Sequence, residues 1–122
     1  MILADTSVWI DHLRLGDKEM RLRLSRGEIA SHPFVIGELA LGSLKDRGKV
    51  LGWLDFLPQV RVAQTSEVRH AIEARRLYGL GIGLIDAHLI ASVFIDSSLL
   101  LWTRDKKLRR VAESLGIHAS LP

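Results

Sequence analysis

The sequence contains no cysteine, and this absence restricts both its redox chemistry and its choice of metal ligands. Disulfide bonds and thiolate metal sites are excluded, so carboxylate and imidazole are the strong metal ligands that remain. Proline is scarce, with 3 in 122 residues, whereas hydrophobic residues make up 48% of the chain. This composition is typical of a packed globular protein rather than of a disordered one.

Long uncharged hydrophobic runs are missing as well. No stretch approaches the roughly 18 apolar residues that a membrane-spanning helix needs. The N-terminus lacks the basic region and the cleavage site of a signal peptide, so we expect a cytoplasmic protein with no membrane association. The 17 basic and 14 acidic residues give a net charge of +3 and a pI near 9.7, which is compatible with a polyanionic partner but does not demonstrate one.

Short apolar runs alternate with amphipathic stretches along the chain. We expect strands at 2–4, 29–30, 60–62, 98–102 and 117–119. We expect helices around 8–13 and at 17–26, 33–44, 47–57, 65–78, 84–95 and 106–115. The alternation predicts a three-layer α/β/α domain with a mostly parallel central sheet. The length predicts one domain over residues 1–122.

The expected helix boundaries depend on capping residues. The expected N-caps are Thr6 or Ser7, Ser31 or His32, and Thr65 or Ser66, because their side chains can accept hydrogen bonds from free N–H groups. The glycines of 79–83 are interpreted as the end of the helix at 65–78.

Two acids follow apolar strands. Asp5 comes directly after the strand at 2–4, and Asp105 follows the strand at 98–102. Ligands of open parallel sheets bind at the carboxyl ends of the strands. Both carboxylates are therefore expected to point into the same crevice.

Two further acids stand alone on apolar helices. Glu38 is the only charge in residues 33–44, and Asp86 is the only carboxylate in residues 84–95. Burial of a lone carboxylate is costly unless it is paired, hydrogen-bonded or bound to a metal. For Glu38, an exposed position or an internal salt bridge explains the residue equally well.

Together these four carboxylates would form a cluster whose mutual repulsion calls for a divalent cation. Oxygen ligands suit Mg²⁺, with Mn²⁺ as the alternative. Such an ion can activate a water molecule and stabilise the charge on a phosphodiester during cleavage. The sequence therefore predicts a nuclease-type metal site.

Four segments carry a family resemblance: MILADTSVWIDHLR at 1–14, IGELALGSL at 36–44, GIGLIDAHLIA at 81–91 and LWTRDKKL at 101–108. They resemble the PIN-domain nucleases, and more narrowly the VapC-type toxins of bacterial toxin–antitoxin pairs. All four segments occur in family order and cover nearly the whole chain. The resemblance implies a PIN-like three-layer fold.

The resemblance also implies site residues. It assigns catalysis to Asp5, Glu38, Asp86 and Asp105. The three aspartates are expected to hold Mg²⁺, while Glu38 completes the shell or orients the attacking water. Thr6 and Thr103 match supporting hydroxyls that orient carboxylates or metal-bound water, although helix capping is an equal alternative for Thr6.

The resemblance further implies an activity and partners. The expected activity is cleavage of cellular RNA by a metal-activated water, which leaves a 3′-hydroxyl and a 5′-phosphate. The expected partners are a second copy in a homodimer and a VapB-type antitoxin whose C-terminal segment reaches the active site. The alternative function is a catalytically weak PIN module that mainly binds the antitoxin in a repressor complex. None of the four acids is missing, which favours the enzyme.

Basic and aromatic residues complete the sequence predictions. Arg104, beside the last acid, is expected to contact RNA phosphate. Trp102 is expected in the core. Trp9, Trp53 and Phe56 are expected in the core or at an interface, and Trp53 and Phe56 would there line a groove for the antitoxin or a partner subunit.

Overall fold

A parallel three-stranded sheet lies at the centre of the computed structural model, which describes all 122 residues. The strand order is β2-β1-β3, so β1 (Ile2–Ala4) lies between β2 (Ile29–Ala30) and β3 (Leu100–Trp102). In the register of β1 and β3, Ala4 pairs with Trp102. The carboxyl ends of these two strands therefore lie side by side, as the sequence predicts.

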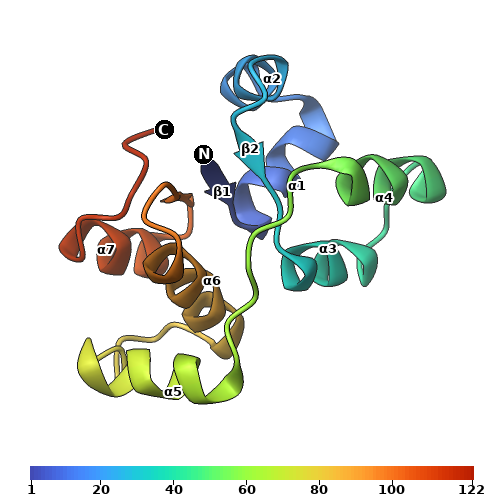
Figure 1. Cartoon of the computed structure of the whole chain (residues 1–122). Helices are drawn as coiled ribbons and strands as arrows, with labels where there is room; N and C mark the ends of the chain where they lie inside the picture. The colour runs from blue at the N-terminus through green and yellow to red at the C-terminus, as the bar shows by residue number, and fades with distance from the viewer.

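Seven helices surround this sheet (Figure 1). They are α1 (Thr6–Leu15), α2 (Lys18–Ser25), α3 (Pro33–Ala40), α4 (Arg47–Phe56), α5 (Thr65–Ala74), α6 (Leu84–Ile95) and α7 (Lys106–Ser114). In Figure 1, α3 and α4 lie on one side of the strands and α5, α6 and α7 on the other. The predicted α/β architecture with a parallel sheet is confirmed. None of the helices has the length and hydrophobicity required to cross a membrane.

The core contains most of the apolar strand residues, among them Leu3, Ile29 and Leu101, and two of the three tryptophans, whereas Leu100 of β3 is 41% exposed. Trp9 and Trp102 are buried, as predicted. Trp53 and Phe56 of α4 are 61% and 91% exposed, so of the two predicted locations the core is wrong, while the interface stays a prediction. The α4 helix therefore presents two large aromatic side chains to solvent.

Two of the predicted strands are reduced to single bridges. Residues 60–62 form no strand; the only pairing near them is a bridge between Gln59 and Ser31. The hydroxyl of Ser92 donates a hydrogen bond to the carbonyl of Arg61 at 2.8 Å, so a helix residue takes the place of a neighbouring strand. Residues 117–119 likewise form one bridge, between His118 and Leu101.

The third deviation concerns the strand predicted at 98–102, which begins only at Leu100. The carboxylate of Asp96 accepts hydrogen bonds from both the backbone N–H and the hydroxyl of Ser98, at 3.0 and 2.7 Å. This local turn keeps Ser98 out of the sheet.

Two helices end earlier than predicted. The α3 helix stops at Ala40 rather than near residue 44, because the guanidinium of Arg47 donates hydrogen bonds to the carbonyls of Ala40 and Gly42. The α5 helix stops at Ala74 rather than near residue 78. There Arg76 adopts a left-handed conformation, with φ of 53°, so the glycines of 79–83 do not end this helix.

The capping predictions are partly wrong. Asp5, not Thr6 or Ser7, caps α1, and Gln64, not Thr65 or Ser66, caps α5. At α3 the cap is His32, one of the two predicted residues, whose ring accepts a hydrogen bond from the N–H of Phe34.

Candidate active site

The ends of β1 and β3 bring Asp5 and Thr103 together. The N–H of Asp5 donates to the carbonyl of Trp102 at 3.0 Å, which continues the sheet by one residue. The hydroxyl of Thr103 donates to Oδ2 of Asp5 at 2.6 Å. On the other carboxylate oxygen, Oδ1 accepts hydrogen bonds from the hydroxyl and the N–H of Ser7, at 2.5 and 3.0 Å. Both oxygens of Asp5 are thus fixed in direction.

Burial makes the Asp5 carboxylate costly to ionise. The side chain is only 5% exposed, and burial raises its pKa. The hydrogen bonds from Ser7 and Thr103 lower the pKa but do not offset the burial. A cation beside Asp5 would favour its charged form.

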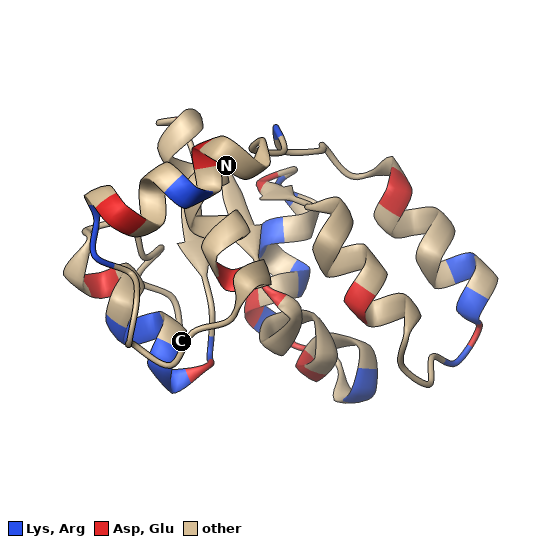
Figure 2. Ribbon diagram, turned by 90° about the horizontal axis from the view of Figure 1, so that it is seen from below, with Lys and Arg blue, Asp and Glu red and all other residues tan.

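Asp86 lies in the first turn of α6, where the negative charges of the other three acids act on its carboxylate. Burial raises its pKa, and the charges of Asp5, Asp105 and Glu38 raise it further, while a hydrogen bond from the N–H of Gly83 at 3.1 Å lowers it. Figure 2 shows acidic positions on several separate elements in the middle of the view. The fold therefore brings Asp5, Glu38 and Asp105 within electrostatic range of Asp86.

Both predicted supporting threonines contact an acid. The hydroxyl of Thr6 donates to Oε1 of Glu38 at 3.3 Å, which joins the start of α1 to α3. The Thr103 hydroxyl, besides donating to Asp5, accepts a hydrogen bond from the N–H of Asp105 at 3.1 Å. Asp105 also caps α7, because its Oδ1 accepts from the N–H of Leu108 at 2.9 Å. Thr103 thus links the two strand-end acids.

The donor set fits a hard divalent cation. The four acids supply only oxygen, and the pKa of Asp86 is raised first by burial and in addition by the charges of the other three. No three Asp, Glu or His side chains lie close enough together to hold a metal ion by themselves. An ion here would therefore contact at most two of these side chains directly and keep several waters, as Mg²⁺ commonly does.

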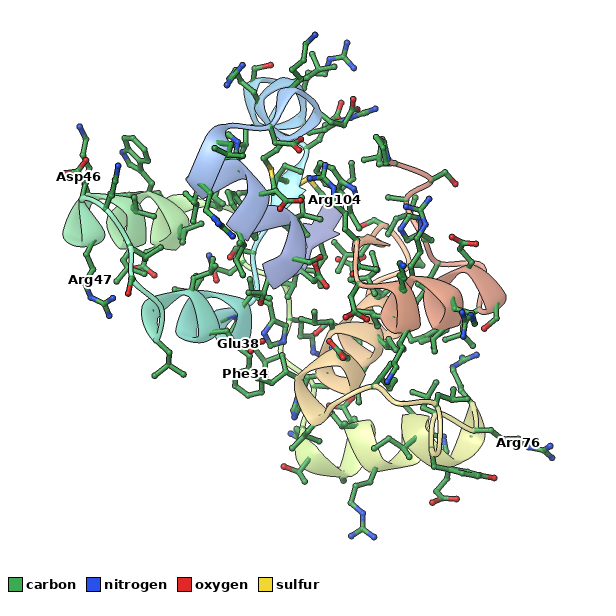
Figure 3. All side chains as sticks on the ribbon, turned by 180° about the vertical axis from the view of Figure 1, so that it is seen from behind. Phe34, Glu38, Asp46, Arg47, Arg76 and Arg104 are labelled. Atoms are coloured by element: carbon green, nitrogen blue, oxygen red, sulfur yellow. The ribbon has the colours of Figure 1, made fainter.

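Arg104, predicted to contact RNA, has other partners. Its guanidinium pairs with Asp11 at 2.8 Å and with Asp17 at 2.7 Å, and its Nε donates to the carbonyl of Pro122 at 2.8 Å. Figure 3 shows Arg104 apart from Glu38. The acidic partners lie 93 and 87 positions earlier in the chain, so the sequence offered no local signal for these pairs.

Ser7 is a residue whose role the sequence did not reveal. Its hydroxyl donates to Asp5 and accepts a hydrogen bond from the N–H of Arg104 at 3.0 Å. Ser7 therefore connects the start of α1 to the chain after β3. The only signal in the sequence was its position two residues after an acid.

An aromatic cluster joins α3 to α6 beside the acids. The ring of Phe34 lies 5.0 Å from the ring of His32 and 4.7 Å from that of His88, measured between centroids. Phe34 and Glu38 lie one turn apart on the same side of α3 (Figure 3). His32 Nε2 and His88 Nδ1 are buried without a hydrogen-bond partner. The two helices that carry Glu38 and Asp86 are thus held together by packed rings.

A pocket of about 430 Å³ opens beside Glu38. Thr6 and Glu38 form part of its wall, and the apolar residues Ile10, Leu13, Leu39, Leu44 and Val50 line it together with Arg14 and Lys45. The pocket therefore combines an apolar surface with positive charge next to one of the four acids.

Comparison with known proteins identifies the class that this fold and these acids define. The chain belongs to the PIN-domain family, whose model matches residues 2–114. Within that family it is of the VapC type: it is 46% identical over 117 residues to proteins named Ribonuclease VapC32 from two Mycobacterium tuberculosis strains, CDC 1551 and H37Rv. The match covers 96% of this chain and 94% of each relative. The predicted family is confirmed.

A solved structure supports the fold. The crystal structure of PAE2754 from Pyrobaculum aerophilum matches with a TM-score of 0.57 and covers 93% of this chain and 92% of that one. Its sequence identity of 23% limits the similarity to the fold.

Proposed function

We propose that this protein is the Mg²⁺-dependent endoribonuclease toxin of a toxin–antitoxin pair and cleaves cellular RNA. One observation carries the proposal: Asp5, Glu38, Asp86 and Asp105 come from four parts of the chain, and three of them raise the pKa of the fourth. The relative named Ribonuclease VapC32 supports the choice of RNA as substrate. Mn²⁺ is the alternative ion.

In this proposal Asp5, Asp86 and Asp105 would hold the ion partly through its retained waters, because no three of the acidic side chains lie close enough together to bind it directly. When bound, the ion would activate water and offset negative charge on the phosphodiester under attack. Asp5 is suited to a ligand's role because three donors fix its two oxygens in place. Thr103 sets the spacing between Asp5 and Asp105, because its one hydroxyl contacts both residues.

Glu38 has a different role in the proposal. It is exposed on α3 and contacts Thr6, so it is more free to move than Asp5. A carboxylate in this position can complete the shell of the ion or orient the attacking water. The Thr6 hydroxyl restricts the direction of the Glu38 carboxylate.

We also propose the partners. A VapB-type antitoxin would place an amphipathic segment in the pocket beside Glu38, because that surface is apolar and carries Arg14 and Lys45. The exposed aromatic pair of α4, Trp53 and Phe56, would take part in a homodimer, since such side chains are enriched at interfaces.

The experiment replaces single acids. Asp5→Asn and Asp86→Asn are each expected to abolish Mg²⁺-dependent RNA cleavage and to relieve growth arrest on expression, while thermal melts show a folded protein. Asp55→Asn, at an exposed position of α4, is the matched control and should retain activity. Cleavage is measured as 5′-phosphorylated fragments.

Two results would contradict the proposal. If both site variants were as active as the parent, the four acids would not be the active site. If the parent bound its antitoxin but cleaved no RNA with either ion, the protein would be the catalytically weak binding module.

A further inference from the structure

The loop that leads into α6 lies against a lysine of α7. A Cβ atom built on Gly81 would lie 2.9 Å from Cδ of Lys107, 3.2 Å from Nζ and 3.3 Å from Cε. These distances are too short for a side chain at position 81 unless the lysine moves. The end of the Lys107 side chain therefore lies along the backbone at Gly81.

Two observations favour glycine at position 81. Its φ of +78° belongs to the left-handed region, which L-residues with side chains rarely adopt. In addition, any Cβ would displace Lys107. Since α5 already ends at Ala74, ending that helix does not explain this glycine.

Lys107 carries an unpaired positive charge. Arg104 and Arg109 are engaged, with Asp17 and with Glu113 respectively, each at 2.7 Å, whereas Lys106 and Arg110 form no salt bridge either, so the contact with the backbone at Gly81 is what distinguishes Lys107. Lys107 is exposed and takes part in none of the salt bridges of the protein. Its ammonium group is thus available to an anion from solution.

The position of Lys107 connects two of the four acids. It follows Asp105 by two residues in the first turn of α7. The loop that it touches ends at Gly83, whose N–H donates to Asp86. Lys107 therefore lies at the edge of the carboxylate cluster, between the segments that carry Asp86 and Asp105.

We infer that Lys107, positioned by Gly81, binds a backbone phosphate of the RNA next to the scissile one. This inference rests on the proposed ribonuclease function. Four carboxylates repel a phosphodiester, so a cation at the edge of the cluster lowers the cost of its approach. A lysine suits this task because its compact charge on a flexible stem follows a phosphate without a fixed geometry. Lys107 thereby takes the role that the sequence assigned to Arg104.

The test measures RNA binding without cleavage. In an Asp5→Asn background, a fluorescent single-stranded oligoribonucleotide is titrated at fixed Mg²⁺ and several NaCl concentrations. Lys107→Met, which keeps most of the stem, should weaken binding about fivefold at 0.1 M salt and reduce the slope of log K against log[salt] by about 0.7. Lys106→Met is the matched control and should leave the slope unchanged.

Glycine variants separate the positioning contact from backbone strain. Gly81→Ala should weaken binding as Lys107→Met does, and the double variant should bind no more weakly than Lys107→Met alone. Gly79→Ala is the control, because Gly79 also has a positive φ, +71°, but a Cβ there would meet no atom within 4 Å.

The outcomes are distinct. If the Asp5→Asn protein binds RNA and Lys107→Met leaves affinity and slope unchanged, the inference is wrong while the proposed function stands. If Gly81→Ala weakens binding no more than Gly79→Ala, the positioning role of Gly81 is wrong. If neither the parent nor the Asp5→Asn protein binds RNA, the inference and the proposed function fail together.

Discussion

Acidification is expected to destabilise this fold through one buried histidine, His32. Its side chain is 0% exposed, its Nδ1 accepts the hydrogen bond that caps α3, and its Nε2 has no partner. Burial, and to a lesser extent the nearby His88, lowers the pKa of His32 from 6.5 to about 4. Between about pH 4 and 6.5, His32 is therefore neutral in the folded protein but protonated in the unfolded chain.

The magnitude follows from these two pKa values. The unfolded chain takes up a proton near pH 6.5, whereas the folded protein does so only near pH 4. The free energy of unfolding should therefore fall as the pH drops from 6.5 to 4, since acid favours the state that binds more protons. At about 1.36 kcal/mol per pKa unit, the loss amounts to about 3 kcal/mol. Above pH 6.5 the full contribution is present.

The assay is urea unfolding between pH 4 and 7 for the parent and His32→Asn. Asparagine also caps helices but does not titrate, so the variant should show a smaller dependence on pH, whatever its overall stability. Asp5 and Asp86, whose pKa values are raised, favour the fold on acidification, and they do so equally in both proteins. His70→Asn, at an exposed position of α5, should retain the parent's pH dependence. If the free energy of unfolding fell by the same amount between pH 7 and 4 in the parent and in His32→Asn, His32 would not be the source of the acid sensitivity.

Two further predictions concern charges near the candidate site. Asp86→Asn should raise the melting temperature at neutral pH without added metal, because it removes a negative charge that burial and the other three acids disfavour. Asp96→Asn is the control and should not raise the melting temperature, because hydrogen bonds from Ser98 stabilise the charged form of Asp96 and lower its pKa. A clearly lower melting temperature for Asp86→Asn would count against the cluster. Arg104→Met should lower the free energy of unfolding by about 2 kcal/mol in urea, because Asp17, whose pKa its hydrogen bond lowers, loses its partner. Unchanged stability together with weakened RNA binding would instead support the RNA contact predicted from the sequence.

The location of the acids could be inferred from the sequence because it depends on local patterns. The apolar runs before Asp5 and Asp105 are strands, and parallel pairing then requires that their carboxyl ends meet. Helix α6 was equally evident, because an unbroken apolar stretch surrounds Asp86. These inferences needed only residues adjacent in the chain.

Two of the errors come from partners that are distant in sequence. Ser92 takes the carbonyl of Arg61, so residues 60–62 form no strand. Arg104 forms salt bridges with Asp11 and Asp17, which lie near the other end of the chain. Neither of these contacts has a local signature. The end of α5, in contrast, depends on a local contact, since the N–H of Leu77 donates back to the carbonyl of Ile72 while the Leu77 side chain is buried.

Three of the acids lie at the beginning of a helix: Asp5 caps α1, Asp105 caps α7, and Asp86 lies in the first turn of α6. Each helix start carries about half a unit of positive charge, so the backbone itself offsets part of the repulsion among these carboxylates. The same oxygens that make the site therefore also start the helices. Loss of Asp5 or Asp105 to alanine would cost about 1 kcal/mol of stability as well as any activity. We expect that relatives without nuclease activity have another capping residue, such as asparagine or serine, in place of these two aspartates, because the helices still need their N-caps.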